Sequence, residues 1–365
     1  MNLREKVVSI LRRKTKEDIK QEKTEENSVT LDDLMNYISN RIVGQEDAIK
    51  TLISNIVYNQ VLIDEVEQSE NVDLTVLESR KISMLLDGPA GTGKSAIIND
   101  IASKVSIPVS VTNIAKFFEN GFTANDILYD LLVKADGDLQ LAERGIIVID
   151  EIEKIANNSD YSTIEARKSI QEEIIELMNG EIYDFGISQG DSNVNISFDT
   201  SKLTFVMSGN LSKQKSKKLT GEGQVRITGF VNNDKGEENT TIKGYINSGI
   251  IPNFFEKIKV VATTKNYEVE DYKNILLHSE ISPLGNLVKT IKKFDYENVK
   301  CDAGLISKLA TDAYELGVGA RGLQILVSEA QNKVLFDIMT QKYNKSEVIN
   351  LTQDLLEPGR QRVRK

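Results

Sequence analysis

The sequence predicts an α/β fold in which a parallel sheet is covered by helices on both faces, followed by a smaller helical domain. Short apolar runs that stop at Gly, Pro or a polar residue alternate with segments of helical apolar spacing as far as about Thr263. This alternation is typical of parallel strands joined by crossover helices. Beyond Thr263 helical spacing dominates. The length of 365 residues suggests two or three structural units, because domains usually contain about 100–200 residues.

The strands are expected where short apolar runs end, at Ile82–Leu86, Pro108–Val111, Gly145–Ile149 and Leu203–Ser208. Helices are expected between them at Ser95–Lys104, Asn125–Ala135 and Ile164–Asn179. The helices of the second domain are expected at Tyr272–Leu277, Pro283–Lys293, Ala303–Leu316 and Gly322–Thr340. Two further helices, around Leu31–Ile38 and Ile49–Ile56, precede a polar loop at Asp64–Asn71.

Composition divides the chain into four segments. Residues 1–30 form a charged leader with one short apolar patch, which predicts either a docking helix with a linker or a leader without fixed structure. We expect the α/β domain at residues 31–262 and the helical domain at residues 263–350. Residues 351–365 form a basic tail.

Charge and rare residues exclude several function classes. The 55 acidic residues outnumber the 45 basic ones and give a net charge of −10, so no overall field favours nucleic acid or an anionic membrane. One cysteine, Cys301, and one histidine, His278, exclude a disulfide framework, a cysteine-cluster zinc domain and His-rich metal sites. No apolar run approaches the roughly 20 residues of a membrane span. We therefore expect a cytoplasmic protein with no membrane or nucleic-acid partner.

Residues 88–95 read GPAGTGKS and match the pattern G-x-x-x-x-G-K-[ST] between an apolar strand and a helix. Glycines let the backbone turn tightly and aim successive N–H groups at phosphate oxygens. Lys94 is expected to reach the β- and γ-phosphates, and Ser95 to ligate Mg²⁺. The sequence therefore predicts that ATP and Mg²⁺ bind at Gly88, Pro89, Ala90, Gly91, Thr92, Gly93, Lys94 and Ser95.

A second acidic motif follows the strand within GIIVIDE, at residues 145–151. Asp150 and Glu151 stand at the carboxyl end of that strand, which is where open α/β sheets bind ligands. We expect Asp150 to hold Mg²⁺ largely through water, and Glu151 to orient and deprotonate the attacking water. Alone, an apolar run followed by Asp-Glu is also common at ordinary strand ends.

Taken together, these motifs resemble the AAA+ ATPases, and within them the ClpX/HslU group of protein unfoldases. The resemblance runs in unbroken order from about Leu31 to Val348. It implies a P-loop large domain followed by a small helical lid. The segments that carry it, besides the phosphate loop, are RIVGQEDAI (Arg41–Ile49), VYN (Val57–Asn59), GIIVIDEIEKI (145–155), FDTSKLTFVMSGN (198–210), GIIPNFFEKI (249–258) and GARGL (319–323).

The resemblance implies roles for four further residues. Ile42 and Val43 would frame the adenine, Asn210 would be the first sensor of the γ-phosphate, and Arg321 would be the second. An amide after a strand next to the Asp150 strand can hydrogen-bond the attacking water, although an Asn there can also form an Asx turn. Arg321 begins a helix and can reach the γ-phosphate; the alternative is an ordinary surface arginine.

The family threads polypeptide through a hexameric ring with an aromatic loop, and the matching position is GFTA. Gly121, Phe122, Thr123 and Ala124 would form this loop, with Phe122 as the gripping side chain. A flat apolar ring contacts any chain without reading its sequence. The alternative is that Phe122 is an ordinary core aromatic.

The chain departs from the family where relatives carry Gly-Arg and this sequence has Glu256-Lys257. That arginine would reach the neighbouring subunit's nucleotide, and Lys257 keeps its charge without its two-donor fork. Hydrolysis is then slow, or Lys257 suffices, or another arginine such as Arg226 substitutes. The cysteine count also leaves no amino-terminal zinc domain in the sequence. Within the polar segment 211–248, Ile227–Phe230 imperfectly matches the loop that docks ClpX on a peptidase.

We conclude that the sequence favours an ATP-dependent unfoldase that forms a homohexameric ring, acts on protein substrates and in one version works with a ClpP-like peptidase. The first alternative is a nucleotide-gated binding module with weak turnover and no peptidase. The second, which the negative charge disfavours, is a AAA+ factor that acts on DNA.

Overall fold

The computed structural model describes residues 31–68, 75–105, 107–119, 121–155, 163–189, 192–211, 250–345 and 348–356. Its contacts divide the chain into two units. The first unit contains the residues up to Met35, Asp47–Gly88 and Lys94–Thr264. The second contains Asn36–Glu46, Pro89–Gly93 and the residues from Lys265 onward. The boundary near residue 263 that the sequence suggests stays a prediction, and two short earlier segments join the second unit.

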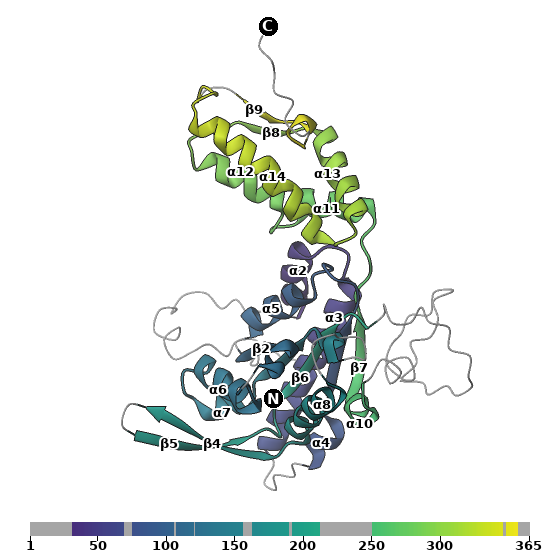
Figure 1. The fold of residues 1–365 in the computed structure, drawn as a ribbon, viewed down its shortest axis with the longest axis vertical. Coiled ribbons are helices and arrows are strands. Elements are labelled where there is room, and N and C mark those ends of the chain that lie inside the picture. The colour runs from purple at the N-terminus through teal and green to yellow at the C-terminus, as the bar shows by residue number, and fades with distance from the viewer. Residues whose placement is uncertain are drawn as a thin grey trace, which may run out of the picture. The chain divides into compact units, whose positions relative to one another are not determined.

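The first unit is built on a parallel sheet of five strands in the order β2-β3-β6-β1-β7 (Figure 1). The strands are β2 (Val109–Asn113), β3 (Ile146–Asp150), β6 (Thr204–Gly209), β1 (Ser83–Asp87) and β7 (Ile258–Thr263). Every neighbouring pair is parallel, so the chain must cross over the sheet between them, and helices make these crossovers. The predicted α/β class is confirmed.

Helices and two short 3₁₀ helices surround this sheet. They are α3 (Glu46–Glu67), α4 (Thr75–Arg80), α5 (Lys94–Val105), η2 (Ile114–Phe118), α6 (Ala124–Lys134), α7 (Leu139–Glu143), η3 (Ile152–Ile155), α8 (Ile164–Asn179) and α10 (Pro252–Glu256). The three helices predicted between the strands begin and end within one residue of α5, α6 and α8, and α8 matches residue for residue, whereas α3 extends well beyond the predicted Ile49–Ile56.

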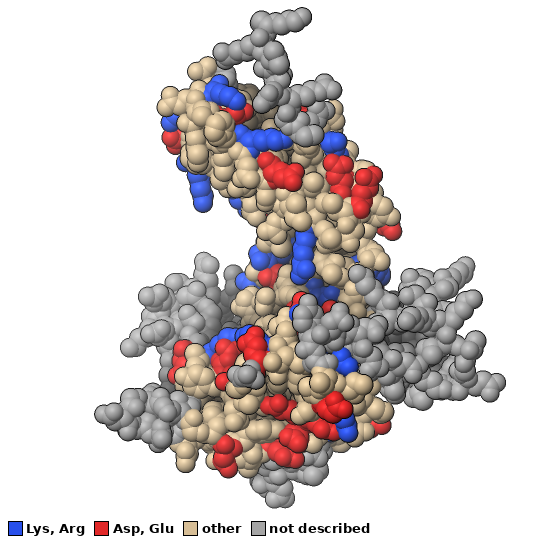
Figure 2. Space-filling model, in the orientation of Figure 1, with Lys and Arg blue, Asp and Glu red and all other residues tan. Residues whose placement is uncertain are grey.

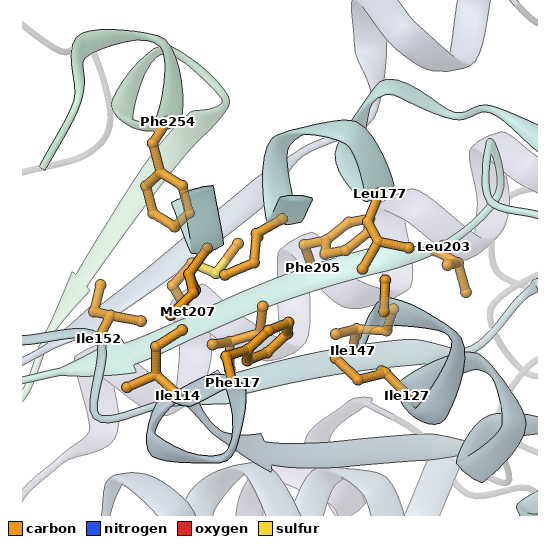
Figure 3. Close-up of a cluster of buried hydrophobic side chains, with 14 of the residues drawn as sticks. Ile114, Phe117, Ile127, Ile147, Ile152, Leu177, Leu203, Phe205, Met207 and Phe254 are labelled. Carbon is orange, nitrogen blue, oxygen red and sulfur yellow. The ribbon is translucent and has the colours of Figure 1, made fainter. Parts of the chain in front are cut away.

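Both faces of the sheet are covered. On one face Ile147, Phe205 and Met207 pack against Leu177 of α8 and Phe254 of α10 (Figure 3). Residues that alternate with these along β6 point to the other face. There the Nδ2 atom of Asn59 in α3 lies 3.4 Å from Oγ1 of Thr204.

Two parts of the first unit escaped prediction. The edge strand β7 carries Lys259, and its middle residues are only half-buried, so its apolar run is weak. A two-stranded antiparallel sheet, β4 (Ile182–Gln189) with β5 (Ser192–Asp199), lies between α8 and β6 in the chain. Apolar and polar residues alternate along β5, with Val194, Ile196 and Phe198 at every second position, and this strand pattern is absent from the predicted elements.

The expected polar loop at Asp64–Asn71 is wrong at its start, because α3 continues to Glu67. Asp64 is buried there and pairs with Arg144, which also binds Glu67 at 2.8 Å. A buried carboxylate is tolerated in a helix when a cation compensates it. The partner lies 80 residues away in the chain, so the sequence pattern could not reveal it.

The second unit is mostly helical, as predicted. Its helices are α11 (Val269–His278), α12 (Pro283–Lys292), α13 (Ala303–Leu316) and α14 (Ala320–Met339). They enclose an apolar core that includes Leu309 and Leu323. The chain also forms a short parallel pair, β8 (Val299–Cys301) with β9 (Ile349–Leu351), and a 3₁₀ helix, η5 (Gln353–Leu356). Helix α2 (Leu31–Arg41) precedes all of these elements.

Among the described residues, no helix has both the length and the apolar character needed to cross a bilayer. On the face shown in Figure 2, basic and acidic side chains lie beside one another over the described residues.

Candidate nucleotide-binding site

The phosphate loop begins where β1 ends and leads into α5 at Lys94. The ammonium of Lys94 donates a hydrogen bond to the carbonyl oxygen of Gly88 at 2.7 Å. The amino end of a helix presents free N–H groups and the positive end of its dipole, which suits an anion. Lys94 therefore stands beside the loop that the sequence predicts to hold phosphate.

Ser95 and Asp150 lie together at the carboxyl edge of the sheet. The hydroxyl of Ser95 donates a hydrogen bond to Oδ2 of Asp150 at 3.0 Å. The other carboxylate oxygen, Oδ1, accepts the N–H of Glu151 at 2.9 Å. Hard oxygen ligands from one or two side chains, with water and phosphate for the rest, suit Mg²⁺. The donor set thus fits the predicted metal, although no group of three or more His, Cys, Asp or Glu among the described residues is arranged to hold an ion.

Glu151 has an unusual backbone and a restrained side chain. Its φ is +61°, a left-handed conformation that non-glycine residues rarely adopt and that often marks functional sites. Its carboxylate accepts a hydrogen bond from the side-chain amide of Asn113 and pairs with Lys154. Both partners use the same oxygen, Oε2, so that oxygen is not free to accept a proton from water.

Asn113 is a site residue that sequence reasoning missed. It ends β2 and pairs in register with Asp150 of the neighbouring strand. Its Oδ1 accepts the N–H of Ala115 at 2.9 Å and caps η2, which leaves its NH₂ group to meet Glu151. A polar residue at the end of the strand beside the Asp-Glu motif was the available signal.

Asn210 follows β6, the strand between β3 and β1. Its N–H donates to Oε2 of Glu153 at 3.0 Å. Its side-chain Oδ1 is buried, and no described residue donates a hydrogen bond to it. The structure therefore places the predicted first sensor at the same sheet edge as Asp150 and Glu151.

In the second unit, the phosphate-loop residue Gly91 lies against the start of α14. The N–H of Ala320 donates to the carbonyl oxygen of Gly91 at 2.8 Å. A Cβ atom on Gly319 would lie 2.5 Å from that oxygen, closer than real contacts allow, so only glycine fits. Arg321 is the next residue of α14 and is exposed. The predicted second sensor thus stands one residue from a direct bond to the phosphate loop.

Ile42 and Val43 also belong to this unit. Ile42 is buried, and its Cγ2 would lie 3.1 Å from a Cβ atom built on Gly93. Val43 is partly buried and packs on the core of the helical unit. Ile42 therefore borders the phosphate loop, as an adenine-framing role requires, whereas the position of Val43 is that of a packing residue.

Two further contacts of this unit were not predicted, and one of them is made with the phosphate loop. The hydroxyl of Tyr267 donates to the carbonyl oxygen of Thr92 at 3.0 Å. Burial raises the pKa of Tyr267 to about 12. The side-chain amide of Gln45 bonds both the N–H and the carbonyl of Lys265, at 2.8 and 2.9 Å. These partners are 175 and 220 residues apart in the chain, so no local pattern announces them.

The predicted pore loop has a more buried aromatic than a gripping role suggests. Phe122 is half-buried and meets Phe117 edge to face, with ring centroids 5.2 Å apart. Gly121 and Thr123 are exposed, and the N–H of buried Ala124 donates to Glu173 at 2.6 Å. The Nζ atom of Lys116 lies 5.7 Å from the Phe122 ring centroid. The ring thus combines a core contact with a partly open face.

Lys257 does not join the other site residues. It caps α10 and directly precedes β7, which runs parallel to β1. Lys257 thus lies beside the amino end of β1, whereas Gly88 follows its carboxyl end. The strand has five residues and spans about 16 Å. Lys257 therefore lies at the other edge of the sheet from its own phosphate loop. Arg226 and Ile227–Phe230 lie outside the described residues.

Comparisons with known proteins agree with this geometry. Residues 84–231 match the AAA family, described as "ATPase family associated with various cellular activities". The chain is 27% identical over 332 residues to the "ATP-dependent Clp protease ATP-binding subunit ClpX" of Borrelia duttonii, covering 87% of this chain and 76% of the relative. The chain carries an AAA ATPase domain and is ClpX-like in sequence.

The protein of the same name from Treponema denticola is also 27% identical, over 341 residues, with 88% of this chain and 80% of the relative covered. The matched residues of the AAA family begin in β1 and include Lys94, Asp150 and Asn210. This AAA+ protein is an ATPase on the strength of that family and of its ClpX relatives.

Proposed function

We propose that this ATPase uses ATP hydrolysis to unfold or remodel other proteins. The observation that carries the proposal is the meeting of Ser95, Asp150 and Glu151 at one sheet edge, through the 3.0 Å bond between Ser95 and Asp150. Over most of its length the chain is similar to proteins named as ATP-binding subunits of the ATP-dependent Clp protease. This similarity supports proteins as the substrates of the ATPase.

In this proposal Lys94 and the phosphate-loop amides bind the triphosphate, and Ser95 and Asp150 hold Mg²⁺. The metal, when bound, would neutralise charge on the β- and γ-phosphates. Glu151 accepts a proton from the attacking water once its carboxylate leaves Asn113 and Lys154. Asn210 hydrogen-bonds the water or the γ-phosphate, and Arg321 contacts the γ-phosphate from α14.

We further propose a homohexameric ring. The location of Lys257 is consistent with it, because a cation at the amino ends of the strands is remote from its own phosphate loop and is left to act on a neighbouring subunit's nucleotide. Phe122 of each subunit would then contact polypeptide in a central pore. The protein would work in the cytoplasm, on protein rather than nucleic acid, and the name of its relatives, a subunit of a Clp protease, suggests a ClpP-like peptidase as partner.

A specific observation favours a second candidate, a nucleotide-gated binding protein with weak turnover. Asn113 and Lys154 both engage the Glu151 carboxylate, which would slow hydrolysis until something displaces them. Lys257 in place of an arginine would slow it further. In this version ATP binding changes which proteins are held, and no peptidase is required.

Retention of an unfolded polypeptide tests the proposal. Glu151→Gln should bind ATP but hydrolyse it about a hundredfold more slowly, so it should hold a labelled, permanently unfolded polypeptide when ATP is present. Lys94→Ala should bind neither ATP nor the polypeptide. Fluorescence anisotropy measures both. Polypeptide binding that is absent, or that is the same with and without ATP, would contradict the proposal.

Assembly is tested separately. Sedimentation velocity of Glu151→Gln with ATP should show a hexamer, and Lys94→Ala under the same conditions should remain smaller. A monomer in ATP at micromolar protein concentrations would remove the ring from the proposal while leaving the ATPase assignment intact.

A further inference from the structure

Two carboxylates hold the backbone that carries Asn210. The N–H of Asn210 donates to Oε2 of Glu153 at 3.0 Å, and the next N–H, that of Leu211, donates to Oδ1 of Asp87 at 2.9 Å. Asp87 is the last residue of β1, and Glu153 belongs to η3, which follows β3. Because β6 lies between β3 and β1, the two acids accept hydrogen bonds from the backbone after its carboxyl end, one from each side.

The main chain of β1 reinforces this arrangement. The N–H of Gly88 donates to the carbonyl oxygen of Gly209 at 3.1 Å. Three consecutive residues, Gly209, Asn210 and Leu211, are therefore each bonded to a neighbouring element. The first of these bonds comes from the phosphate loop itself.

Glycine at position 209 is what lets Glu153 approach. A Cβ atom there would lie 2.7 Å from Oε2 of Glu153 and 2.9 Å from a side-chain carbon of Ile152. Any larger residue would push the carboxylate away from the N–H of Asn210. The close approach is thus specified by three residues from two separate segments.

Acids are a costly choice for this position. Asp87 is 1% exposed, and burying a carboxylate is unfavourable unless hydrogen bonds compensate it. It also directly precedes a loop that binds a polyanion, where like charge weakens phosphate binding. Packing alone would favour an apolar residue after Met84, Leu85 and Leu86. What a carboxylate adds is a strong, directional hydrogen bond to a backbone N–H.

We propose that Asp87 and Glu153 are positioning residues that fix the Asn210 side chain for ATP hydrolysis. The buried Oδ1 of Asn210, to which no described residue donates, is the atom they aim. An amide oxygen held in place before the reaction can accept a hydrogen bond from the attacking water at no reorganisation cost. The inference rests on the proposed sensor role of Asn210.

Paired variants test it. Asp87→Asn and Glu153→Gln keep an oxygen that accepts the backbone N–H, whereas Asp87→Val and Glu153→Met do not. The apolar variants should lower kcat about tenfold, with the KM for ATP within about twofold of wild type. The amide variants should lose about threefold at most. Equal losses in amide and apolar variants would overturn the proposal.

A double-mutant cycle separates positioning from general destabilisation. If both acids act through Asn210, Glu153→Met should cost little further kcat in the Asn210→Ala background. The same loss in both backgrounds would overturn the inference and leave the role of Asn210 standing. An unchanged kcat in Asn210→Ala itself would remove that role, and the inference with it. Should Asp87→Val fail to fold, as judged by circular dichroism, the Glu153 pair decides the question alone.

Discussion

The carbonyl oxygen of Gly91 accepts a hydrogen bond from the N–H of Ala320 at 2.8 Å. This bond joins the phosphate loop to the first turn of α14, one residue before Arg321. A movement of the loop on binding phosphate would therefore be transmitted through this bond to the helix that carries the proposed second sensor.

Gly319→Ala should disrupt this contact and weaken ATP binding about tenfold or more, because its Cβ atom would lie 2.5 Å from the carbonyl oxygen of Gly91. Titration of a fluorescent ATP analogue measures the affinity. Gly317→Ala is the matched control: its φ is also positive, at +63°, but nothing lies within 4 Å of its added methyl group. The control should lose about 1 kcal/mol of stability and keep its affinity. Equal affinities for the two variants would contradict the prediction.

Asn113→Asp should raise basal ATP turnover several-fold. The aspartate can still accept the N–H of Ala115 and cap η2, but it cannot donate to Glu151, so the Glu151 carboxylate keeps only its pair with Lys154 and turns more readily toward water. A phosphate-release assay without polypeptide gives the rate. Asn113→Ala, which loses both contacts, should also lose about 1 kcal/mol of stability. Turnover that falls in a fully folded Asn113→Asp protein would show that the Asn113 bond supports hydrolysis rather than restraining it.

Lys257→Arg should raise turnover severalfold and Lys257→Ala should lower it about tenfold, since a guanidinium offers two parallel donors to phosphate. Steady-state phosphate release at saturating ATP is the measurement. The matched control is Lys259→Ala in the following strand, whose ammonium donates to the carbonyl of Ser79; its turnover should stay within about twofold of wild type. If neither Lys257 variant changed turnover, Lys257 would be excluded from the nucleotide site of the neighbouring subunit.

Tyr267 should make stability fall at high pH. Burial raises its pKa to about 12, from an ordinary value of 10.0, so the folded state keeps a proton that the unfolded chain releases. Its contribution is complete below pH 10 and is lost progressively up to about pH 12, by roughly 2–3 kcal/mol. Urea unfolding of Tyr267→Phe should therefore show a shallower decline over this range than wild type. Tyr129→Phe, at an exposed position, is the control, and parallel declines in all three proteins would contradict the assignment.

Most of the architecture was readable from periodicity, because four of the five sheet strands are short apolar runs with clear ends. The strand β7 escaped because it lies at an edge, where Lys259 and half-buried neighbours blur the apolar pattern. The last turn of α3, which contains Asp64, escaped because the stabilising partner of Asp64, Arg144, is remote in the chain.

The site residues also divide into those that the sequence predicts and those that only the structure reveals. Lys94, Ser95 and Asp150 could be found because a phosphate loop and an acidic strand end each need fixed residue types at fixed spacing. Tyr267 and Gln45 could not, because their contacts with distant residues arise only in the folded chain. Asn113 had a signal in its place at the end of the strand beside the Asp-Glu motif, but its contact with Glu151 also arises only on folding. Phe122 was identified by position alone, and its contact with Phe117 leaves its role in threading a prediction.

The central claim is that ATP turnover is coupled to the handling of polypeptide, and one rate tests it most directly. Phosphate release is measured with and without a permanently unfolded polypeptide, in wild type and in Phe122→Ala. We predict that the polypeptide stimulates wild-type turnover at least about twofold and that Phe122→Ala keeps basal turnover but loses the stimulation. A wild-type rate of phosphate release that is the same with and without the polypeptide would contradict the claim.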